Sequence, residues 1–122
     1  MPEQLKRGRI TEILLLAEKG FTKNTKKFTT FVNDKSINVI PDIFNDTDHI
    51  VGEIKDVAEL AATDQIKAEI SLAKQLGYNY KLFVEEGTKL SDGLLKELNT
   101  YEKIEVVRFK REDLWKAFSD IN

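Results

Sequence analysis

Three short segments typical of β-strands follow one another in the first half of the chain, with only tight turns between them. They are rich in Val, Ile, Phe and Thr, and turn-forming Asp and Asn residues separate them. Because so short a connection leaves no room for a helix, consecutive strands must run antiparallel and form a meander. We expect these strands at residues 27–33, 36–44 and 49–57.

Helical patterns flank this meander. Apolar residues at helical spacing predict a first helix over residues 5–19, which Gly20 would end. Thr63 is a suitable N-cap for a second helix with apolar residues up to Leu76 on one face, and Gly77 would end it. The remaining expected elements are a strand over 78–84, a short helix from Ser91, a strand over 103–109 and a helix over 111–118.

The order of these elements predicts the fold class. The chain begins αβββαβ and continues with a further helix and strand, which predicts an α/β protein with a mixed β-sheet flanked by helices. The strand after the Thr63 helix is expected to return through a right-handed crossover and to pair in parallel. Because the chain has 122 residues and no repeat or linker, residues 1–122 are expected to form one domain.

Composition excludes several kinds of site. The chain has no Cys, which removes disulfides, thiolate metal sites and Cys nucleophiles. Its single His, His49, falls in an expected turn, which argues against a zinc site or a His-based triad. No apolar run is long enough to span a membrane, and the N-terminus does not resemble a signal peptide. Any delivery across a membrane would therefore depend on sequence outside this chain.

Charge is divided unevenly along the chain, although the net charge is only −2. Residues 1–40 hold 8 Lys and Arg against 4 Asp and Glu, whereas residues 41–122 hold 11 against 17. The basic first part could face a phosphate backbone. A solvated charged surface is the alternative interpretation of the same distribution.

The hairpin formed by the second and third strands carries charges at unusual places. Taking its turn as residues 46–49 puts Asp42 opposite Glu53, and opposed residues share a face of the sheet. Lys55 is two residues from Glu53 and points the same way. Two carboxylates this close repel unless a cation or a proton lies between them, so the pattern predicts a divalent metal with oxygen ligands. An exposed Glu–Lys pair beside a strand-end Asp is the alternative.

Pro41-Asp42, followed on the next strand by Glu53-Ile54-Lys55, resembles the PD-(D/E)xK motif of the restriction-endonuclease-like nuclease superfamily. The expected αβββαβ order also resembles the core of that superfamily, in which a meander carries the motif. More narrowly, the stretches IPDIFND, IVGEIKDV and QIKAEISLAKQLGYNYKLFVEEGTKLSDGL resemble the toxin domains of this fold at the C-termini of bacterial polymorphic and contact-dependent inhibition toxins.

This resemblance spans residues 7–109 and implies roles for the motif. Asp42, Glu53 and the backbone carbonyl of Ile54 would bind one or two divalent ions, Mg²⁺ or Mn²⁺, with Zn²⁺ as a further option. Lys55 would be the catalytic lysine, which positions or deprotonates the attacking water. These assignments come from the family and not from the spacing of the residues.

Helix residues have implied roles as well. Glu12, on the first helix, would be an outer ligand or a ligand of a second metal ion. Gln65, on the second helix, would orient the water or a phosphate. An ordinary surface position in a helix is the alternative for both. Lys6 and Arg9, in the basic first part, would contact phosphate groups of the substrate.

The resemblance implies a metal-dependent endonuclease that hydrolyses phosphodiester bonds, in DNA rather than RNA, as the toxin of an interbacterial competition system. A cognate immunity protein would bind the monomeric domain and form a heterodimer with it. We expect release from the producing cell and action in the cytoplasm of the target cell, without membrane association. The alternatives are an RNA- or tRNA-cleaving toxin of the same fold, a junction-resolvase-like nuclease, and a non-catalytic binding module that keeps the fold.

Overall fold

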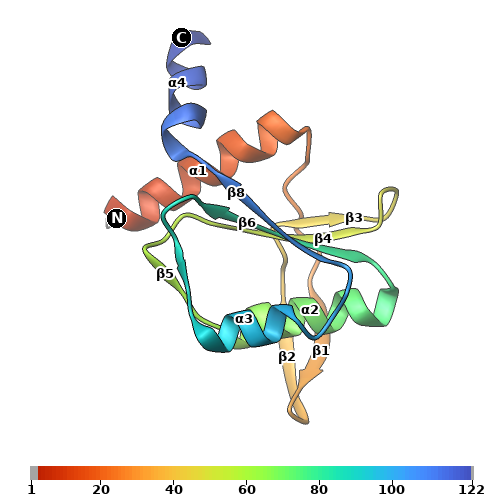
Figure 1. Ribbon diagram of the computed structural model, residues 1–122. Helices are drawn as coiled ribbons and strands as arrows, with labels where there is room; N and C mark the ends of the chain where they lie inside the picture. Colours follow the sequence, from red (N-terminus) through yellow and green to blue (C-terminus); the bar gives the residue numbers. More distant parts are fainter. Residues whose placement is uncertain (1–2, 122) are drawn as a thin grey trace.

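The computed structural model describes residues 3–121 and consists of a β-sheet between two layers of helices (Figure 1). The central sheet has the strand order β3-β4-β6-β8, in which β3 runs antiparallel to β4 and the other neighbours are parallel. The expected mixed sheet flanked by helices is therefore confirmed. Its strands are β3 (Ile43–Asn45), β4 (Ile50–Lys55), β6 (Asn79–Glu85) and β8 (Ile104–Phe109).

Each face of the sheet has its own hydrophobic core. On one face, Leu15 of α1 packs with Phe83 of the sheet and with the start of α4. On the other face, Ile70 of α2 packs with Leu82 of the sheet and with α3. A site on the sheet can therefore receive side chains from two separate helical layers. The helices are α1 (Glu3–Lys19), α2 (Asp64–Leu76), α3 (Asp92–Leu98) and α4 (Arg111–Ile121).

The strand expected at 36–44 is broken in the structure, so the expected three-strand meander is wrong. Its first part pairs with β1 (Phe28–Val32) as β2 (Lys35–Val39), and these two form a separate hairpin. Pro41 lies in the break and has no N–H to give to a strand partner. Asn24 forms hydrogen bonds with the backbone of the break instead. Its N–H donates to the Asp42 carbonyl at 3.0 Å, and its Nδ2 donates to the Pro41 carbonyl at 2.9 Å.

The remaining hairpin, β3–β4, has the expected register. Phe44 lies opposite Val51, and Asn45 lies opposite Ile50. Asp42 falls just before the first residue of β3, and its N–H donates to Glu53 Oε1 at 3.2 Å. The two residues thus face each other as predicted, although Asp42 belongs to the break and not to the strand.

The connection from β4 to β6 also follows the sequence signals. Thr63 accepts a hydrogen bond from the Ile66 N–H at 3.2 Å, and Gly77 ends α2 in the left-handed conformation. β4 and β6 pair in parallel, as expected. Leu76 is 43% exposed, so its place on the buried face of α2 was predicted wrongly. A small parallel pair, β5 (Glu59–Leu60) with β7 (Lys89–Leu90), joins the two connecting loops.

Within residues 3–121, none of the helices combines the length and the apolar character that a membrane span requires.

Candidate active site

A hollow of about 280 Å³ lies where β3 begins and β4 ends. All five side chains that the sequence singled out for chemistry line it, together with Arg9. Lys6 is exposed and is not among the lining residues. The five are Glu12 of α1, Asp42 before β3, Glu53 and Lys55 of β4, and Gln65 in the first turn of α2.

The sheet brings these side chains together at one of its edges. Side chains alternate along β4, so Val51, Glu53 and Lys55 face the layer of α2, whereas Ile54 packs in the core on the α1 side. The first residue of β3, Ile43, pairs with Gly52. The residues of β4 after Gly52 therefore have no strand beside them on that edge. The opening that results admits side chains from both helical layers.

Asp42 takes the place of the missing strand partner. The N–H of Ile54 donates to Asp42 Oδ2 at 2.9 Å, and the N–H of Asp42 donates to Glu53 Oε1. The N–H and C=O of one strand residue face the same neighbour. We therefore expect the carbonyl of Ile54 to be directed at the same edge as the two carboxylates.

Glu53 is a buried carboxylate, with 1% of the residue exposed. Gln65 Nε2 donates to its Oε2 at 2.8 Å, and Lys55 Nζ lies 3.4 Å from the same oxygen. Burial, followed by the negative charges of Glu69 and Asp42, raises the pKa of Glu53 to about 10. Lys55 opposes this shift without cancelling it, so the Glu53 carboxyl keeps its proton to a higher pH than an ordinary Glu does.

Glu69 and Tyr80 stand behind Glu53, and neither was assigned a role from the sequence. Glu69 is fully buried and accepts hydrogen bonds from Tyr80 Oη at 2.8 Å and from Gln65 Nε2 at 3.3 Å. Burial raises its pKa to about 7. One signal could have revealed it, since Glu69 interrupts the apolar stripe of α2 between Ile66 and Ala73.

Lys23 is a third residue that the sequence did not reveal. Its Nζ donates to Asp42 Oδ1 at 2.7 Å and forms an ion pair with Glu12. Burial opposes a charged ammonium there, but the hydrogen bonds to Asp42 and Glu12 outweigh it and raise the pKa of Lys23. Burial also raises the pKa of Glu12, against the effect of Lys23. Lys23 lies in the loop between α1 and β1, which has no periodic pattern, so the sequence does not reveal its role.

Asp56 anchors the end of β4 on the side opposite Lys55. Arg111 holds its carboxylate with two hydrogen bonds, Nε to Oδ2 at 2.7 Å and Nη2 to Oδ1 at 2.9 Å. Thr11 Oγ1 donates to Oδ2 at 2.7 Å. Although burial acts in the other direction, these bonds lower the pKa of Asp56. The strand end that carries Lys55 is thereby fixed to both α1 and α4.

The oxygen donors of this edge fit a hard divalent cation. Within residues 3–121, no group of three acidic or His side chains is already arranged as a metal cage. Asp42 and Glu53 nevertheless bring two carboxyl groups together at this edge, where the Asp42 N–H donates to Glu53 Oε1 at 3.2 Å. Mg²⁺ typically takes one or two protein carboxylates and leaves its other positions to water and phosphate.

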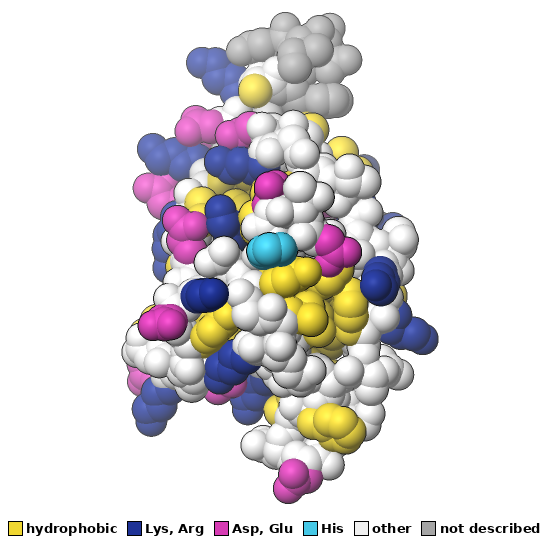
Figure 2. All heavy atoms as spheres, turned by 90° about the vertical axis from the view of Figure 1, so that its right-hand side faces the viewer, with side chains coloured by type: hydrophobic (Ala, Val, Ile, Leu, Met, Phe, Trp, Pro, Cys, Tyr) yellow, Lys and Arg dark blue, Asp and Glu magenta, His cyan; other side chains and the backbone are white. Residues whose placement is uncertain are grey.

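His49 lies at the turn of the β3–β4 hairpin and does not line the hollow. Its ring stacks on Tyr78 with a centroid distance of 4.8 Å, and Tyr78 stacks on Phe44 at 5.9 Å. Figure 2 shows this His in cyan above a hydrophobic patch. The stacking agrees with the interpretation of His49 as a turn residue.

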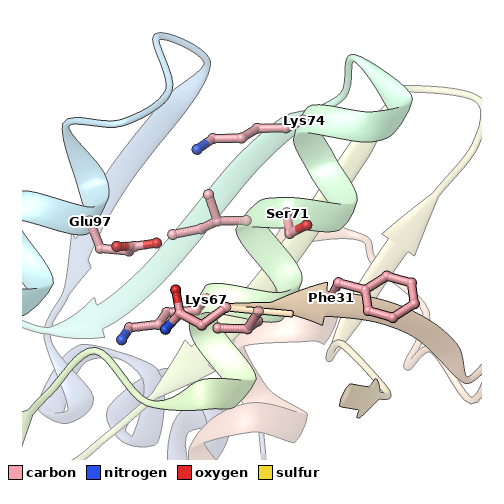
Figure 3. A pocket seen from close by; sticks show the side chains of 8 residues that line it. Phe31, Lys67, Ser71, Lys74 and Glu97 are labelled. Carbon is pink, nitrogen blue, oxygen red and sulfur yellow. The ribbon is translucent and has the colours of Figure 1, made fainter. Parts of the chain in front are cut away.

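A second hollow, of about 230 Å³, lies between α2, α3 and the β1–β2 hairpin (Figure 3). Lys67, Lys74 and Glu97 line it beside the exposed ring of Phe31. A single carboxylate among two lysines does not form a metal-binding pair. This second hollow therefore has no counterpart of the carboxylate pair that Asp42 and Glu53 form.

The protein has a mixed sheet between helices, and Asp42 lies opposite Glu53, which shares β4 with Lys55. This is the arrangement of a restriction-endonuclease-like protein with a PD-(D/E)xK motif. A comparison with protein-family models matches residues 16–94 to the family described as restriction endonuclease fold toxin 7. The match covers more than half of the 122 residues, and the chain belongs to this family.

The family confirms the resemblance seen in the sequence and indicates a nuclease toxin. The matched residues include the Asp42, Glu53 and Lys55 motif and Gln65, and they begin after Glu12. A search of curated proteins gave no match, and a search of solved structures gave none either.

Proposed function

We propose that residues 1–122 form one metal-dependent endonuclease domain that hydrolyses phosphodiester bonds, in DNA rather than RNA. The observation that carries this proposal is the convergence of Asp42, Glu53 and Lys55 in one hollow at the open edge of the sheet. Membership of a restriction endonuclease fold toxin family supports it independently.

Asp42, Glu53 and the Ile54 carbonyl would hold the divalent ion, Mg²⁺ or Mn²⁺, with Zn²⁺ as the third option. When bound, such an ion activates water and withdraws charge from the phosphate oxygens. Lys55, 3.4 Å from Glu53, is placed to position or deprotonate the attacking water and to offset charge that develops on the phosphate. Gln65 orients the Glu53 carboxylate through its 2.8 Å hydrogen bond.

The substrate would approach past the basic side chains around the hollow. Arg9 is exposed and lines the same hollow as the acidic residues. Phosphate groups are bound mainly by such Arg and Lys side chains. Lys67 and Lys74 of the second hollow offer a further place for a phosphate (Figure 3).

The biological setting that we propose is competition between bacteria. The domain would be delivered into the cytoplasm of a target cell, and a cognate immunity protein would neutralise it as a heterodimer with the monomeric toxin. The description of the family as toxins supports this setting.

Digestion of plasmid DNA and of total RNA with Mg²⁺, Mn²⁺, Zn²⁺ or EDTA tests the activity. Asp42→Ala and Lys55→Ala should abolish metal-dependent loss of plasmid. Glu105→Ala and Lys35→Ala are matched controls, because both residues are exposed and neither lines the hollow. Cleavage of RNA alone would keep the site and change the substrate. No cleavage of either by folded protein with any of the metals would favour the binding module.

A further inference from the structure

The ammonium of Lys23 lies between two carboxylates of the hollow. It donates to Asp42 Oδ1 at 2.7 Å and pairs with Glu12. The other oxygen of Asp42 already accepts the Ile54 N–H at 2.9 Å. A metal ion that bridged Glu12 and Asp42 would therefore have to displace this ammonium.

The loop that carries Lys23 is fastened on both sides. Phe21 donates its N–H to the Leu16 carbonyl at 2.9 Å, and its ring packs against Phe83 of the sheet with a centroid distance of 6.4 Å. Asn24 bonds the Asp42 carbonyl at 3.0 Å through its own N–H. A long surface Lys normally loses rotamer freedom when it forms an ion pair, but here the backbone on either side is already positioned.

The Glu53 side of the hollow is different. Its only cationic neighbour among the described ion pairs is Lys55, at 3.4 Å from Oε2. Each side thus has one ammonium. Lys23 bonds both carboxylates of the Asp42–Glu12 side, whereas Lys55 is joined to Glu53 and, among the described ion pairs, not to Asp42. The two sides are unequal as places for a divalent cation.

We propose that Lys23 is a built-in cation that stands where a second divalent ion would otherwise bind. The site then holds one ion, on Asp42, Glu53 and the Ile54 carbonyl, and Glu12 is kept out of its ligand set. The inference rests on the proposed metal-dependent function. It reduces the expected number of metal ions per chain from one or two to one. Lys23 acts as a positioning residue, through the carboxylates that it holds.

The test counts the ions bound by folded, metal-free protein, with isothermal titration of Mn²⁺. Replacing the ammonium with an uncharged side chain in Lys23→Met should add one Mn²⁺ per chain relative to the unaltered protein. Lys23→Arg keeps the positive charge and should keep the original number. Lys27→Met, which removes an exposed Lys of the same loop, is the matched control and should change nothing.

The added ion should disappear again in the double variant Lys23→Met with Glu12→Gln, because Glu12 would be one of its ligands. An increase of one ion that the Glu12 substitution removes supports the proposal. Equal numbers in the unaltered protein and in Lys23→Met overturn it, including the case in which neither binds Mn²⁺. Lys23→Ala is the second variant if Lys23→Met does not fold.

The result is separable from the proposed nuclease activity. Cleavage that depends on Asp42, together with equal ion numbers, would leave the function standing and remove the inference. An added ion in Lys23→Met, together with no cleavage by the unaltered protein, would do the reverse.

Discussion

At the scale of single residues, the hollow concentrates charge that the fold does not neutralise by itself. Glu53 and Glu69 are both buried, and Gln65 bonds both of them. A buried carboxylate costs free energy when it ionises, and the protein therefore keeps a proton there to a higher pH than the unfolded chain does. In an enzyme, such a site is where stability is given up for function.

Replacing Glu53 with Gln should stabilise the metal-free protein, and more so at higher pH. The folded-state pKa of Glu53 is raised to about 10 from 4.5, so the unfolded chain releases this proton first. The folded state therefore loses relative stability as pH rises from about 4.5 to 10. Glu53→Gln has no such titrating group, so its stability does not decrease for this reason as pH rises. Thermal melts in EDTA should show a higher Tm for Glu53→Gln at pH 8, by roughly 3–6 °C for each kcal/mol recovered, and little difference at pH 5. An equal difference at both pH values would contradict the prediction.

Replacing Asp56 with Asn should destabilise the protein strongly, because it leaves Arg111 without its carboxylate in a site that is 5% exposed at Asp56. Because the Arg111 side chain is 33% exposed, the loss of its charged hydrogen-bond partner should cost roughly 1.5–3 kcal/mol. The lowered pKa of Asp56 means that its contribution is present above the unfolded-state pKa and is lost as pH falls through the folded-state value.

Urea melts at pH 7 and at pH 3 measure this effect. Asp56→Asn should lower the free energy of unfolding at pH 7, and the gap to the unaltered protein should narrow in acid. Asp113→Asn, an exposed carboxyl near the start of α4, is the control and should change little. A gap that stays constant with pH would show that the ion pair is not its source.

At the scale of elements, the β3–β4 hairpin is the part that places the motif. Gly52 lies opposite Ile43, and a Cβ on Gly52 would come within 3.1 Å of the Ile43 side chain and 3.3 Å of the Lys81 carbonyl. The glycine therefore lets the two strands approach closely, directly beside Glu53. A larger residue at this position would require Ile43 or the backbone of β6 to move by a few tenths of an ångström.

Gly52→Ala should lower the free energy of unfolding by about 1–3 kcal/mol, because the added methyl group overpacks the hairpin. It should also reduce cleavage, since the pairing of Asp42 with Glu53 depends on this register. Gly93→Ala is the matched control, because a Cβ there meets only Ser91 Oγ at 3.9 Å and Gly93 lies in a helix. If urea melts show equal effects for both variants, close approach at Gly52 is not the cause.

At the scale of the whole molecule, the fold brings the basic first part of the chain and the acidic remainder together at the hollow. The first 40 residues supply Arg9 and Lys23 to the hollow, and the acidic remainder supplies Asp42 and Glu53. Two basic side chains from the first part of the chain thus lie beside the acidic residues. This combination suits a polyanionic substrate that is cut with the help of a cation.

Arg9→Ala should weaken binding of a labelled DNA duplex in EDTA and should reduce the slope of log K against log salt by about 1. The physical reason is the loss of one phosphate contact and of its released counterion. Fluorescence anisotropy over a series of salt concentrations measures both quantities. Lys35→Ala, in the β1–β2 hairpin, is the control and should keep the original slope. An unchanged slope in Arg9→Ala would place the substrate elsewhere.

The sequence by itself determined the order of the four helices, the strands β4, β6 and β8, the capping of α2 and the register that puts Asp42 opposite Glu53 with Lys55 beside it. These features depend on residues close together in the chain, through the two-residue period of strands and the chemistry of turns and caps. A local pattern is enough to read them.

Only the tertiary structure decided the separation of β2 from the central sheet, the position of Lys23 between Glu12 and Asp42, and the ion pair of Asp56 with Arg111. Each depends on groups far apart in the chain, 19 residues for Lys23 and Asp42 and 55 for Asp56 and Arg111. Such contacts follow from the path of a loop and from the burial of a whole sheet edge, and neither leaves a periodic trace in the sequence.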